Sequence, residues 1–369
     1  MGDNGKPKPR ARELGLPVPG TPGPLNAITD IAGLGVGFTT IVSPPRANPQ
    51  IRTGVTAIVP HLNEDAPLCT WAGFHALNGN GEMTGVHWVE DAGLIRGPIL
   101  ITNTHSVGMV HHAAVRWMMT RYAKGLAGHH FWAMPVVAET YDGVLNDING
   151  LHVTEAHALA ALDAAKPGPV AEGNVGGGTG MIAYEWKGGS GTASRQVEAG
   201  GRDGIVAALV QANHGRGEWL TVLGVPVGRE LKPEPVYAKE TGSIIVILAT
   251  DLPMLPHQLR RLAKRAAIGI GRGGTPGGNS SGDIFLAIST ANAMLTPELA
   301  PPLWRLEAIN DEGFDPIYMA AVEAIEEAVL NAMLAAEDTP AVRPPGKLVR
   351  AIPHDALMAA MRRHGRVSG

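Results

Sequence analysis

The sequence is poor in cysteine, with Cys69 as the only one among 369 residues. A single cysteine cannot form a disulfide within the chain, and it excludes a zinc site built from several cysteines. The motif H-E-x-x-H is absent, and the histidine pairs His111/His112 and His129/His130 consist of adjacent residues, whose side chains point in different directions. We therefore predict no metal and no other cofactor, and we expect Cys69 to be a small core residue.

The sequence also lacks a strong charge and a long apolar run. The formal net charge is −4, too small to indicate a nucleic-acid or membrane partner, and no apolar stretch reaches the length of a membrane span. The N-terminus is basic and proline-rich, but no apolar segment follows it, so it does not resemble a signal peptide. We expect a cytoplasmic protein whose residues 1–24 form a Pro-rich arm that is available for contacts with a neighbouring subunit.

What the sequence does contain is a mixture of short strand and helix patterns in one globular domain over residues 1–369, with 44% hydrophobic residues and 48 glycines. Period-two or continuous apolar runs predict strands within residues 26–59 and at 98–102, 132–140, 194–198, 204–212, 243–249 and 283–289. Helical spacing predicts helices at 106–122, 154–165, 254–267, 317–336 and 353–364. Residues 224–241 look like a polar surface linker, and 77–97 and 269–282 like loops. Because the strands and helices follow no steady βαβ rhythm, we predict a layered α/β sandwich and not a doubly wound sheet.

Two glycine motifs fail the test of their context. Residues 278–282 match G-x-S-x-G, but a nucleophile elbow needs a strand before it and a helix after it. Here a loop precedes the motif and a strand pattern follows it. Residues 269–274 match G-x-G-x-x-G, but they follow a predicted helix where a dinucleotide site requires them to open one.

A different chemistry is possible at the step Gly242-Ser243, directly before the apolar run IIVILA. An N-terminal serine carries its own base, because its α-amine has a pKa near ~8 and can take the proton of its own hydroxyl. Such a terminus is exposed when the hydroxyl attacks the preceding carbonyl and water cleaves the resulting ester. A glycine before the serine tolerates the strained backbone that this requires. The plainer alternative is a turn glycine followed by a serine that starts a buried strand.

Ten ordered blocks of sequence bear on that choice, and they run NAITDIAGLGVG, RTGVTAIVP, LNGNGEMTG, TNTHSVG, PVVAETYDGVLND, GNVGGGTGM, KGGSGTASR, LVQANHG, TGSIIVILATD and NSSGDIFLAISTAN. Through them the chain resembles the self-processing P1 peptidases of family S58, the group of L-aminopeptidase/D-amidase-esterases and β-aminopeptidases. The resemblance implies a four-layer αββα sandwich of α/β (α+β) class, like that of the Ntn hydrolases but with different connectivity. It also implies a homotetramer of αβ units.

The resemblance further implies a set of site residues. Cleavage between Gly242 and Ser243 gives an α chain of residues 1–242 and a β chain of residues 243–369, with Ser243 as the nucleophile for both cleavage and turnover. Asn213 occupies the oxyanion-hole position. The remaining positions are Tyr141 near the acyl-enzyme oxygen, Glu139 near the substrate amine, and Ser281 with Asp283 in contact with the new amine and Ser243, directly or through water. Residues i and i+2 of a strand share a face, so Glu139 and Tyr141 are expected to line one pocket.

We therefore predict an N-terminal-serine aminopeptidase that hydrolyses short peptides, amides or esters with a free amine through an acyl-enzyme. Whether L-, D- or β-amino acids are preferred stays open. One alternative is an acyltransferase resembling ornithine acetyltransferase, and another is an amidase on synthetic oligoamides, although both normally use threonine. A third is an unprocessed binding protein, which would keep an intact chain.

Overall fold

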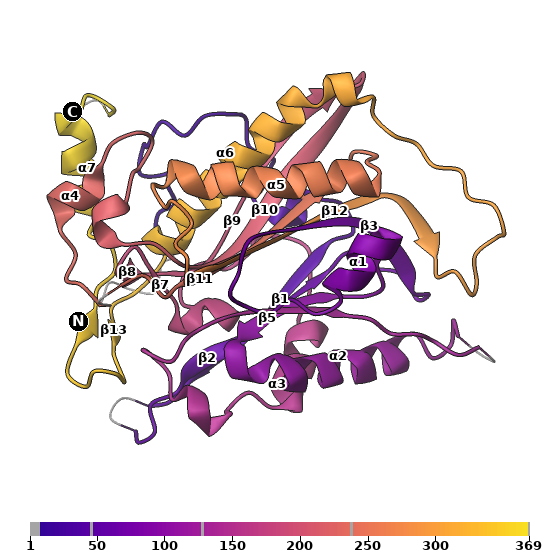
Figure 1. The fold of residues 1–369 in the computed structure, drawn as a ribbon, viewed down its shortest axis with the longest axis horizontal. Coiled ribbons are helices and arrows are strands. Elements are labelled where there is room, and N and C mark those ends of the chain that lie inside the picture. Colours follow the sequence, from indigo (N-terminus) through magenta and orange to yellow (C-terminus); the bar gives the residue numbers. More distant parts are fainter. Residues whose placement is uncertain (1–7, 45–46, 127–128, 237–238, 368–369) are drawn as a thin grey trace.

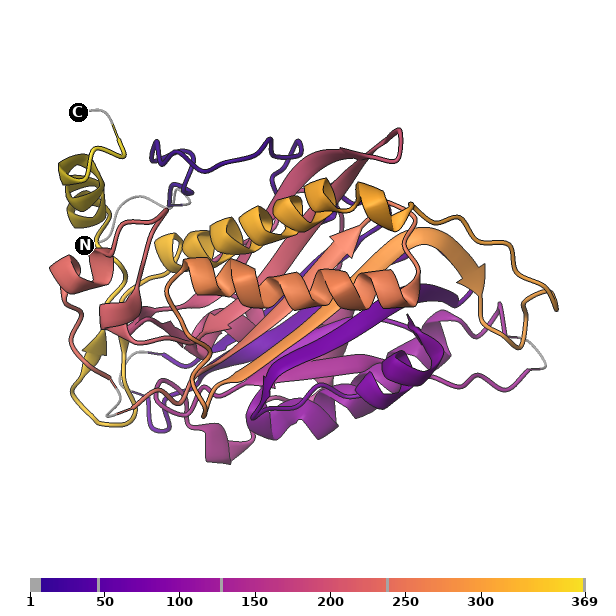
Figure 2. The same ribbon diagram turned by 45° about the horizontal axis from the view of Figure 1, so that its top comes forward.

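Two β-sheets lie face to face in the middle of the molecule, and helices cover both outer faces (Figures 1 and 2). The structure is a computed structural model that describes residues 8–44, 47–126, 129–236 and 239–367. The order of layers is helix, sheet, sheet, helix. The predicted four-layer αββα sandwich is thus confirmed.

The first sheet has four strands in the order β1-β2-β5-β6. Their bounds are Gly35–Val42, Arg52–Val59, Ile99–Asn103 and Val136–Thr140. Helices α2 (Val107–Arg121) and α3 (Glu155–Asp163) pack on its outer face. In Figure 1 these two helices run along the lower side of the molecule.

The second sheet has six strands in the order β4-β3-β12-β11-β10-β9. Their bounds are Leu94–Ile95, Leu68–Gly79, Gly282–Leu295, Ser243–Thr250, Arg202–Asn213 and Gly189–Ala199. Helices α5 (Pro256–Arg272) and α6 (Asp315–Leu334) cover it on the side opposite the first sheet.

Shorter elements complete the fold. The helices are α1 (Val86–Ala92), α4 (Val227–Leu231) and α7 (His354–Arg363), and the paired short strands are β7 (Ile182–Ala183) with β8 (Trp186–Lys187) and β13 (Thr339–Pro340) with β14 (Leu348–Val349). Across the part of the chain that the structure describes, no helix combines the length and the apolar character that a bilayer crossing requires.

Strand β11 explains why an almost uninterrupted apolar run forms the centre of this fold. Successive side chains of a strand point to opposite faces. Ile245, Ile247 and Ala249 enter the core between the two sheets, whereas Ile244 and Val246 enter the core under α5 and α6. Since both faces are covered, every position of β11 is buried, and neither face selects polar residues.

The structure corrects three sequence-based expectations about secondary structure. The long strand β3, Leu68–Gly79, was not predicted. Helix α5 does not end near residue 267 but continues to Arg272, because Gly269 packs against Ile325 of α6, where an added Cβ would lie 2.8 Å from the isoleucine side chain. The presumed polar linker at 224–241 contains α4, with Val227 fully buried. Cys69, in contrast, is a core residue as predicted, and burial raises the pKa of its thiol to about 11.

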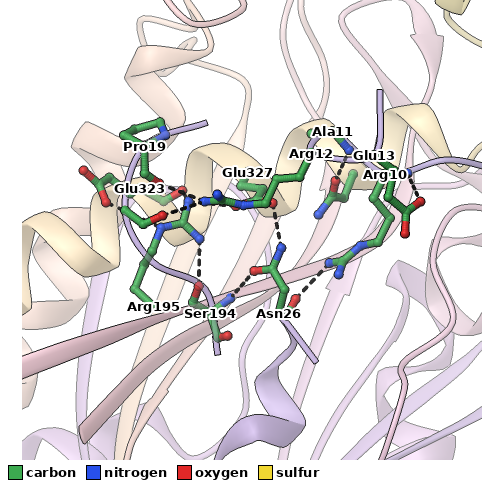
Figure 3. Close-up of polar contacts among 12 residues, drawn as sticks. Arg10, Ala11, Arg12, Glu13, Pro19, Asn26, Ser194, Arg195, Glu323 and Glu327 are labelled. Carbon is green, nitrogen blue, oxygen red and sulfur yellow. Dashed lines mark hydrogen bonds and ion pairs between the residues drawn. The ribbon is translucent and has the colours of Figure 1, made fainter. Parts of the chain in front are cut away.

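The N-terminal arm packs on its own chain. The backbone N–H of Ala11 donates to Asn331 Oδ1 of α6 at 3.0 Å, and Lys8 donates to the carbonyl of Ala336 just beyond that helix. Figure 3 shows the arm crossing α6 and reaching β9. Residues 8–24 thus lie against their own chain, residues 1–7 lie outside the described part, and a contact of the arm with a neighbouring subunit stays a prediction.

A buried carboxylate holds this contact together. Glu327 of α6 has no exposed surface, and its oxygens lie 2.7 Å from Arg195 Nη2 and 3.1 Å from Arg12 Nε (Figure 3). Asn26 Nδ2 also donates to Glu327 Oε1, at 2.7 Å. Arg195 on β9 is 1% exposed. Glu327 thus compensates a buried guanidinium of the sheet, together with Glu323, whose Oε2 lies 3.4 Å from Arg195 Nε, and it also anchors the arm.

We expect the Glu327→Ala variant to lose stability in the range of about 3–5 kcal/mol, because the fully buried partner of Arg195 is removed and only the more distant Glu323, at 3.4 Å, remains beside the guanidinium. The measurement is the unfolding midpoint followed by near-ultraviolet circular dichroism. Glu307→Ala is the matched control, since it removes the pair between Glu307 and Arg202, which lies on the surface and is worth less than about 1 kcal/mol. Equal midpoints for the two variants would show that the buried network adds nothing.

Candidate active site

Ser243 is the first residue of β11 and lies between two neighbouring strands. In the sheet ladder it is opposite Asn213 of β10 on one side and Gly282 of β12 on the other. Ser243 is buried, with 5% of its surface exposed. Ser243 lies two and four residues before Ile245 and Ile247, which face the space between the two sheets. Because side chains alternate along a strand, the Ser243 side chain points to the same face.

The bond between Gly242 and Ser243 is surrounded by hydrogen-bond donors. The Ser243 hydroxyl donates to the Gly242 carbonyl oxygen at 2.8 Å, and the backbone N–H of Gly282 donates to the same oxygen at 3.3 Å. A Cβ on residue 242 would lie 2.1 Å from the Asn213 carbonyl oxygen. Only glycine therefore fits before the serine, and its carbonyl faces both a nucleophile and a backbone donor.

The amide of Asn213 is held in a fixed orientation. Its Oδ1 accepts from the backbone N–H of Ile182 at 2.7 Å, and its Nδ2 donates to the Tyr141 carbonyl at 3.0 Å. An amide nitrogen has two hydrogens, so one N–H remains for another acceptor. A preorganised donor beside Ser243 matches what an oxyanion hole requires.

Glu139 lies at the end of β6 with its carboxylate buried, at 3% exposure. Oε1 accepts from the Glu82 backbone N–H at 3.0 Å, and Oε2 accepts from the Thr104 hydroxyl. A Cβ built on Gly81 would be 3.0 Å from Glu139 Oε1 and 3.7 Å from the Cα of Gly282. The carboxylate is thus separated from the residue opposite Ser243 by a single glycine. Burial raises the pKa of Glu139, and the hydrogen bonds from Thr104 and Glu82 oppose that shift without cancelling it.

Tyr141 lies one residue beyond β6, so the argument from a shared strand face does not apply to it, and the expectation that Tyr141 and Glu139 line one pocket stays a prediction. Strand β6 ends at Thr140, and the Tyr141 residue beyond it is 39% exposed. A Cβ on Gly143 would lie 2.2 Å from the tyrosine hydroxyl, which shows that the ring folds back over that glycine. Through its backbone carbonyl, however, Tyr141 orients the Asn213 amide.

Ser281 and Asp283 lie on either side of Gly282 and contact each other. The Ser281 hydroxyl donates to Asp283 Oδ1 at 2.6 Å. Asp283 is paired with Ile244 and not with Ser243, so strand alternation places its side chain on the face of the sheet away from Ser243. Within the described ranges, no hydrogen bond joins either side chain to Ser243 in this uncleaved chain, and their contact with the new amine and Ser243, directly or through water, stays a prediction. Burial raises the pKa of Asp283, and the Ser281 hydrogen bond partly offsets this rise.

Sequence reasoning missed two further polar residues of this region. Asn78 Nδ2 donates to Asp283 Oδ2 at 3.4 Å and to the Gly278 carbonyl at 3.0 Å. Glu240 accepts from the backbone N–H of Gly215 at 2.6 Å. The block LNGNG contains Asn78, but nothing in its local pattern marks the asparagine as a partner of Asp283. Glu240 stands in a polar stretch that reads as surface.

His214 follows Asn213 but is not suited to acid–base chemistry. It is buried, and its ring nitrogens have no hydrogen-bond partner among the described residues. Burial lowers the pKa of its imidazole to about 3, so the ring stays neutral at physiological pH.

The two glycine motifs lie outside the structural settings that a nucleophile elbow and a dinucleotide site require. G-x-S-x-G stands between a loop and the strand β12, and G-x-G-x-x-G closes α5, so neither matches the structural setting of its motif. Among the residues that the structure describes, no group of three or more His, Cys, Asp or Glu side chains could hold a metal ion.

The chain matches a known protein family and several known proteins. A family model described as Peptidase family S58 matches residues 26–344. The chain is 46% identical over 381 residues to "Beta-peptidyl aminopeptidase BapA" of Sphingosinicella microcystinivorans, covering 98% of this chain and 93% of that protein.

Two solved structures are similar as well. The L-aminopeptidase D-Ala-esterase/amidase of Ochrobactrum anthropi, described as a new variant among the Ntn hydrolase fold, matches with a TM-score of 0.94 and 57% identity over 98% of this chain and 100% of that one. A β-aminopeptidase from Burkholderia sp. matches with a TM-score of 0.88 and 46% identity, over 97% and 99% of the two chains. The predicted resemblance is confirmed over nearly the whole chain.

Proposed function

Since this chain belongs to peptidase family S58 and is an aminopeptidase-type hydrolase, we propose that it cleaves itself between Gly242 and Ser243 and then uses Ser243 as an N-terminal nucleophile. The observation that carries this proposal is the contact of the Ser243 hydroxyl with the Gly242 carbonyl, 2.8 Å from oxygen to oxygen. No cofactor takes part in the proposed reaction.

The self-cleavage begins when Ser243 Oγ attacks the carbonyl carbon of Gly242. The negative charge that develops on the carbonyl oxygen is stabilised by the Gly282 N–H, which already donates to it. The C–N bond then breaks, the hydroxyl proton goes to the departing nitrogen, and Gly242 becomes an ester of Ser243. Water hydrolyses the ester, leaving a carboxylate on Gly242 and a free amine on Ser243.

In turnover, the new amine of Ser243 takes the proton of its own hydroxyl, directly or through water. Ser243 Oγ attacks the substrate carbonyl, the free N–H of Asn213 stabilises the oxyanion, and the leaving group departs with the proton. Water then attacks the acyl-enzyme by the same route. Ser281 and Asp283 hold strand β12 beside the new terminus. Tyr141 orients Asn213 through its backbone, and its hydroxyl remains a predicted contact of the acyl-enzyme.

Glu139 is the group we assign to the substrate amine. Its carboxylate is buried one glycine away from the strand residue opposite Ser243, and a carboxylate in that position can pair with an ammonium group. The substrates are accordingly short peptides, amides and esters with a free N-terminal amine. The names of the similar proteins support both β-amino acid and L- or D-amino acid substrates.

We expect Glu139→Gln to lower kcat/KM by about 10- to 100-fold for a substrate with a free amine, mainly through KM, because a hydrogen bond to a charged group is worth about 1.5–3 kcal/mol. Steady-state kinetics on an amino-acid p-nitroanilide measures this. The matched control is Glu155→Gln, which changes a half-buried glutamate of α3 paired with Arg116 and should leave the kinetics unchanged.

The same residue should produce a pH dependence. Burial raises the pKa of Glu139, and only the ionised carboxylate attracts an ammonium. Affinity is therefore present above the raised pKa and is lost as pH falls through it, at a higher pH than for an ordinary glutamate. KM measured against pH should rise on the acid side in the wild type and stay flat in Glu139→Gln. A wild-type KM that is independent of pH would contradict the assignment.

The direct test of the proposed function is the intact mass of freshly purified protein under denaturing conditions, with N-terminal sequencing of the smaller species. Two chains, the smaller beginning Ser-Ile-Ile-Val, are expected. A chain that stays intact on long incubation would contradict self-cleavage and favour an unprocessed binding protein. Transfer of the acyl group to ornithine in place of water would favour the acyltransferase. A homotetramer of αβ units and a cytoplasmic location remain predictions.

A further inference from the structure

Glu240 holds the segment that leads into the bond between Gly242 and Ser243. Its Oε1 accepts from the Gly215 N–H at 2.6 Å, just beyond the end of β10. Its Oε2 is buried against Gly278, whose backbone N–H helps to lower the pKa of the carboxylate. The carboxylate therefore binds the protein backbone and is turned away from solvent, although it belongs to an otherwise polar stretch.

The walls around this carboxylate are bare backbone. A Cβ on Gly278 would lie 1.9 Å from Glu240 Oε2, so the carboxylate rests against that glycine. Gly215 has a φ of +87°, and its Cβ would lie 2.5 Å from the Tyr184 ring. Together with Gly242, whose Cβ would lie 2.1 Å from the Asn213 carbonyl oxygen, these glycines border the narrow slot that residues 240–242 occupy.

The surroundings of the Glu240 carboxylate disfavour its negative charge. Burial and the nearby Asp283 carboxylate raise the pKa of Glu240, whereas the backbone N–H groups of Gly215 and Gly278 and the charge of Arg216 lower it. Taking a charge out of water costs free energy unless hydrogen bonds compensate it, and here backbone N–H groups provide them. The bond it makes to Gly215 lies next to Asn213 and His214, which form the wall of the scissile segment.

We propose that Glu240 is a positioning residue for self-cleavage, whose carboxylate is anchored on Gly215 and Gly278 and keeps the Gly242 carbonyl within reach of the Ser243 hydroxyl and the Gly282 N–H. This inference rests on the proposed self-cleavage. It assigns Glu240 a role in the uncleaved chain only, because turnover uses Ser243, Asn213 and Glu139, and none of these three accepts or donates a hydrogen bond to Glu240 among the described residues.

Cleavage itself ends that role. The new carboxylate on Gly242 forms two residues from Glu240 and beside the Asp283 region, so three acidic groups then share one small volume. The cut also removes the covalent tie to β11. Repulsion therefore favours the departure of residues 240–242 from the slot, and the position of Gly242 becomes free for the acyl part of a substrate.

The test compares wild type, Glu240→Gln and Glu240→Ala as full-length chains made by cell-free translation. After synthesis is stopped, the conversion of the full-length chain into two fragments is followed in time under denaturing conditions. We expect cleavage to slow at least about tenfold in Glu240→Ala, which corresponds to about 1.4 kcal/mol. Glu240→Gln keeps an acceptor for Gly215 but loses the charge, so its cleavage rate is expected between those of wild type and Glu240→Ala.

Glu234→Ala is the matched control. Glu234 lies on the same segment but is exposed and paired with Lys347, so this variant should cleave at the wild-type rate.

The second readout is turnover per cleaved Ser243 site, which we expect within twofold of wild type in all variants. A Glu240→Ala chain that cleaves as fast as wild type would overturn the inference. Turnover per cleaved site that falls in parallel with cleavage would also overturn it, because it would indicate general damage to the site. A wild-type chain that never cleaves would overturn the self-cleavage itself, which distinguishes that failure from a failure of the role of Glu240.

Discussion

The variant Ser243→Ala is expected to remain one full-length chain and to lose turnover by at least about 10⁴-fold, in line with the removal of a nucleophile from other hydrolases. The alanine has no oxygen to attack Gly242, so the ester never forms and the α-amine that serves as base never appears. Self-cleavage and turnover are lost together because one hydroxyl serves both. Intact mass and steady-state kinetics on the same preparation measure the two effects.

The matched control for this variant is Ser289→Ala. Ser289 is another buried serine of the same sheet, and its hydroxyl donates to the Leu252 carbonyl at 2.7 Å, far along the strand from Ser243. This variant should cleave and turn over normally. A Ser243→Ala protein that is still cut after Gly242, or that retains turnover near the wild-type level, would remove Ser243 from the mechanism.

Asn213→Ala should lower kcat by about 10²–10³-fold with little change in KM, since a single oxyanion donor acts mainly on the transition state. Asn213 also ties Ile182 and Tyr141 together, so part of any loss could arise from displaced backbone. Asn213→Asp addresses this, because it keeps the acceptor for the Ile182 N–H and loses the amide donor. Both variants are expected to show the loss in kcat, measured per cleaved Ser243 site.

Asn103→Ala is the comparison for the asparagine variants. Asn103 is equally buried, in the other sheet, and its amide donates to the Thr53 hydroxyl at 2.8 Å. It should affect stability more than kcat. If Asn213→Asp and Asn103→Ala have the same kcat as wild type, Asn213 is not an oxyanion donor.

Strand β11 could be predicted from the sequence because its apolar run is uninterrupted, and helix α6 because apolar residues recur at helical spacing along its 20 residues. Strand β3 could not, since Gly73, His75 and Asn78 break its pattern. Gly73 is required there by the close approach of α5, where a Cβ would lie 2.1 Å from the Arg260 nitrogen. A glycine also hides the end of α5. In the sequence Gly269 suggests that the helix stops, but in the structure it lies within α5 and packs on Ile325 of α6.

In the site, too, some residues could be identified from the sequence, whereas other features depend on contacts between distant segments. The sequence motifs identified Ser243, Asn213 and Glu139 as candidates, and the structure brings the first two into one ladder pair and the third close to it. It could not be predicted that Asp283 lies on the other face of the sheet, because this depends on the register with β11. The role of Glu240 depends on two glycines far away in the sequence, and no local pattern contains them.

The order of strands in the second sheet has a consequence for how the mature protein can assemble. Strands β11 and β12 follow Ser243 in the chain, whereas their outer neighbours β10 and β3 precede it (Figure 2). A single cut after Gly242 thus converts two rows of main-chain pairing inside one sheet into the boundary between two polypeptides. Separating them would expose four unpaired strand edges, so we expect the fragments of a cut chain to stay associated under native conditions. Once denatured, they must find each other by diffusion, and renaturation changes from a first-order process into one that depends on protein concentration.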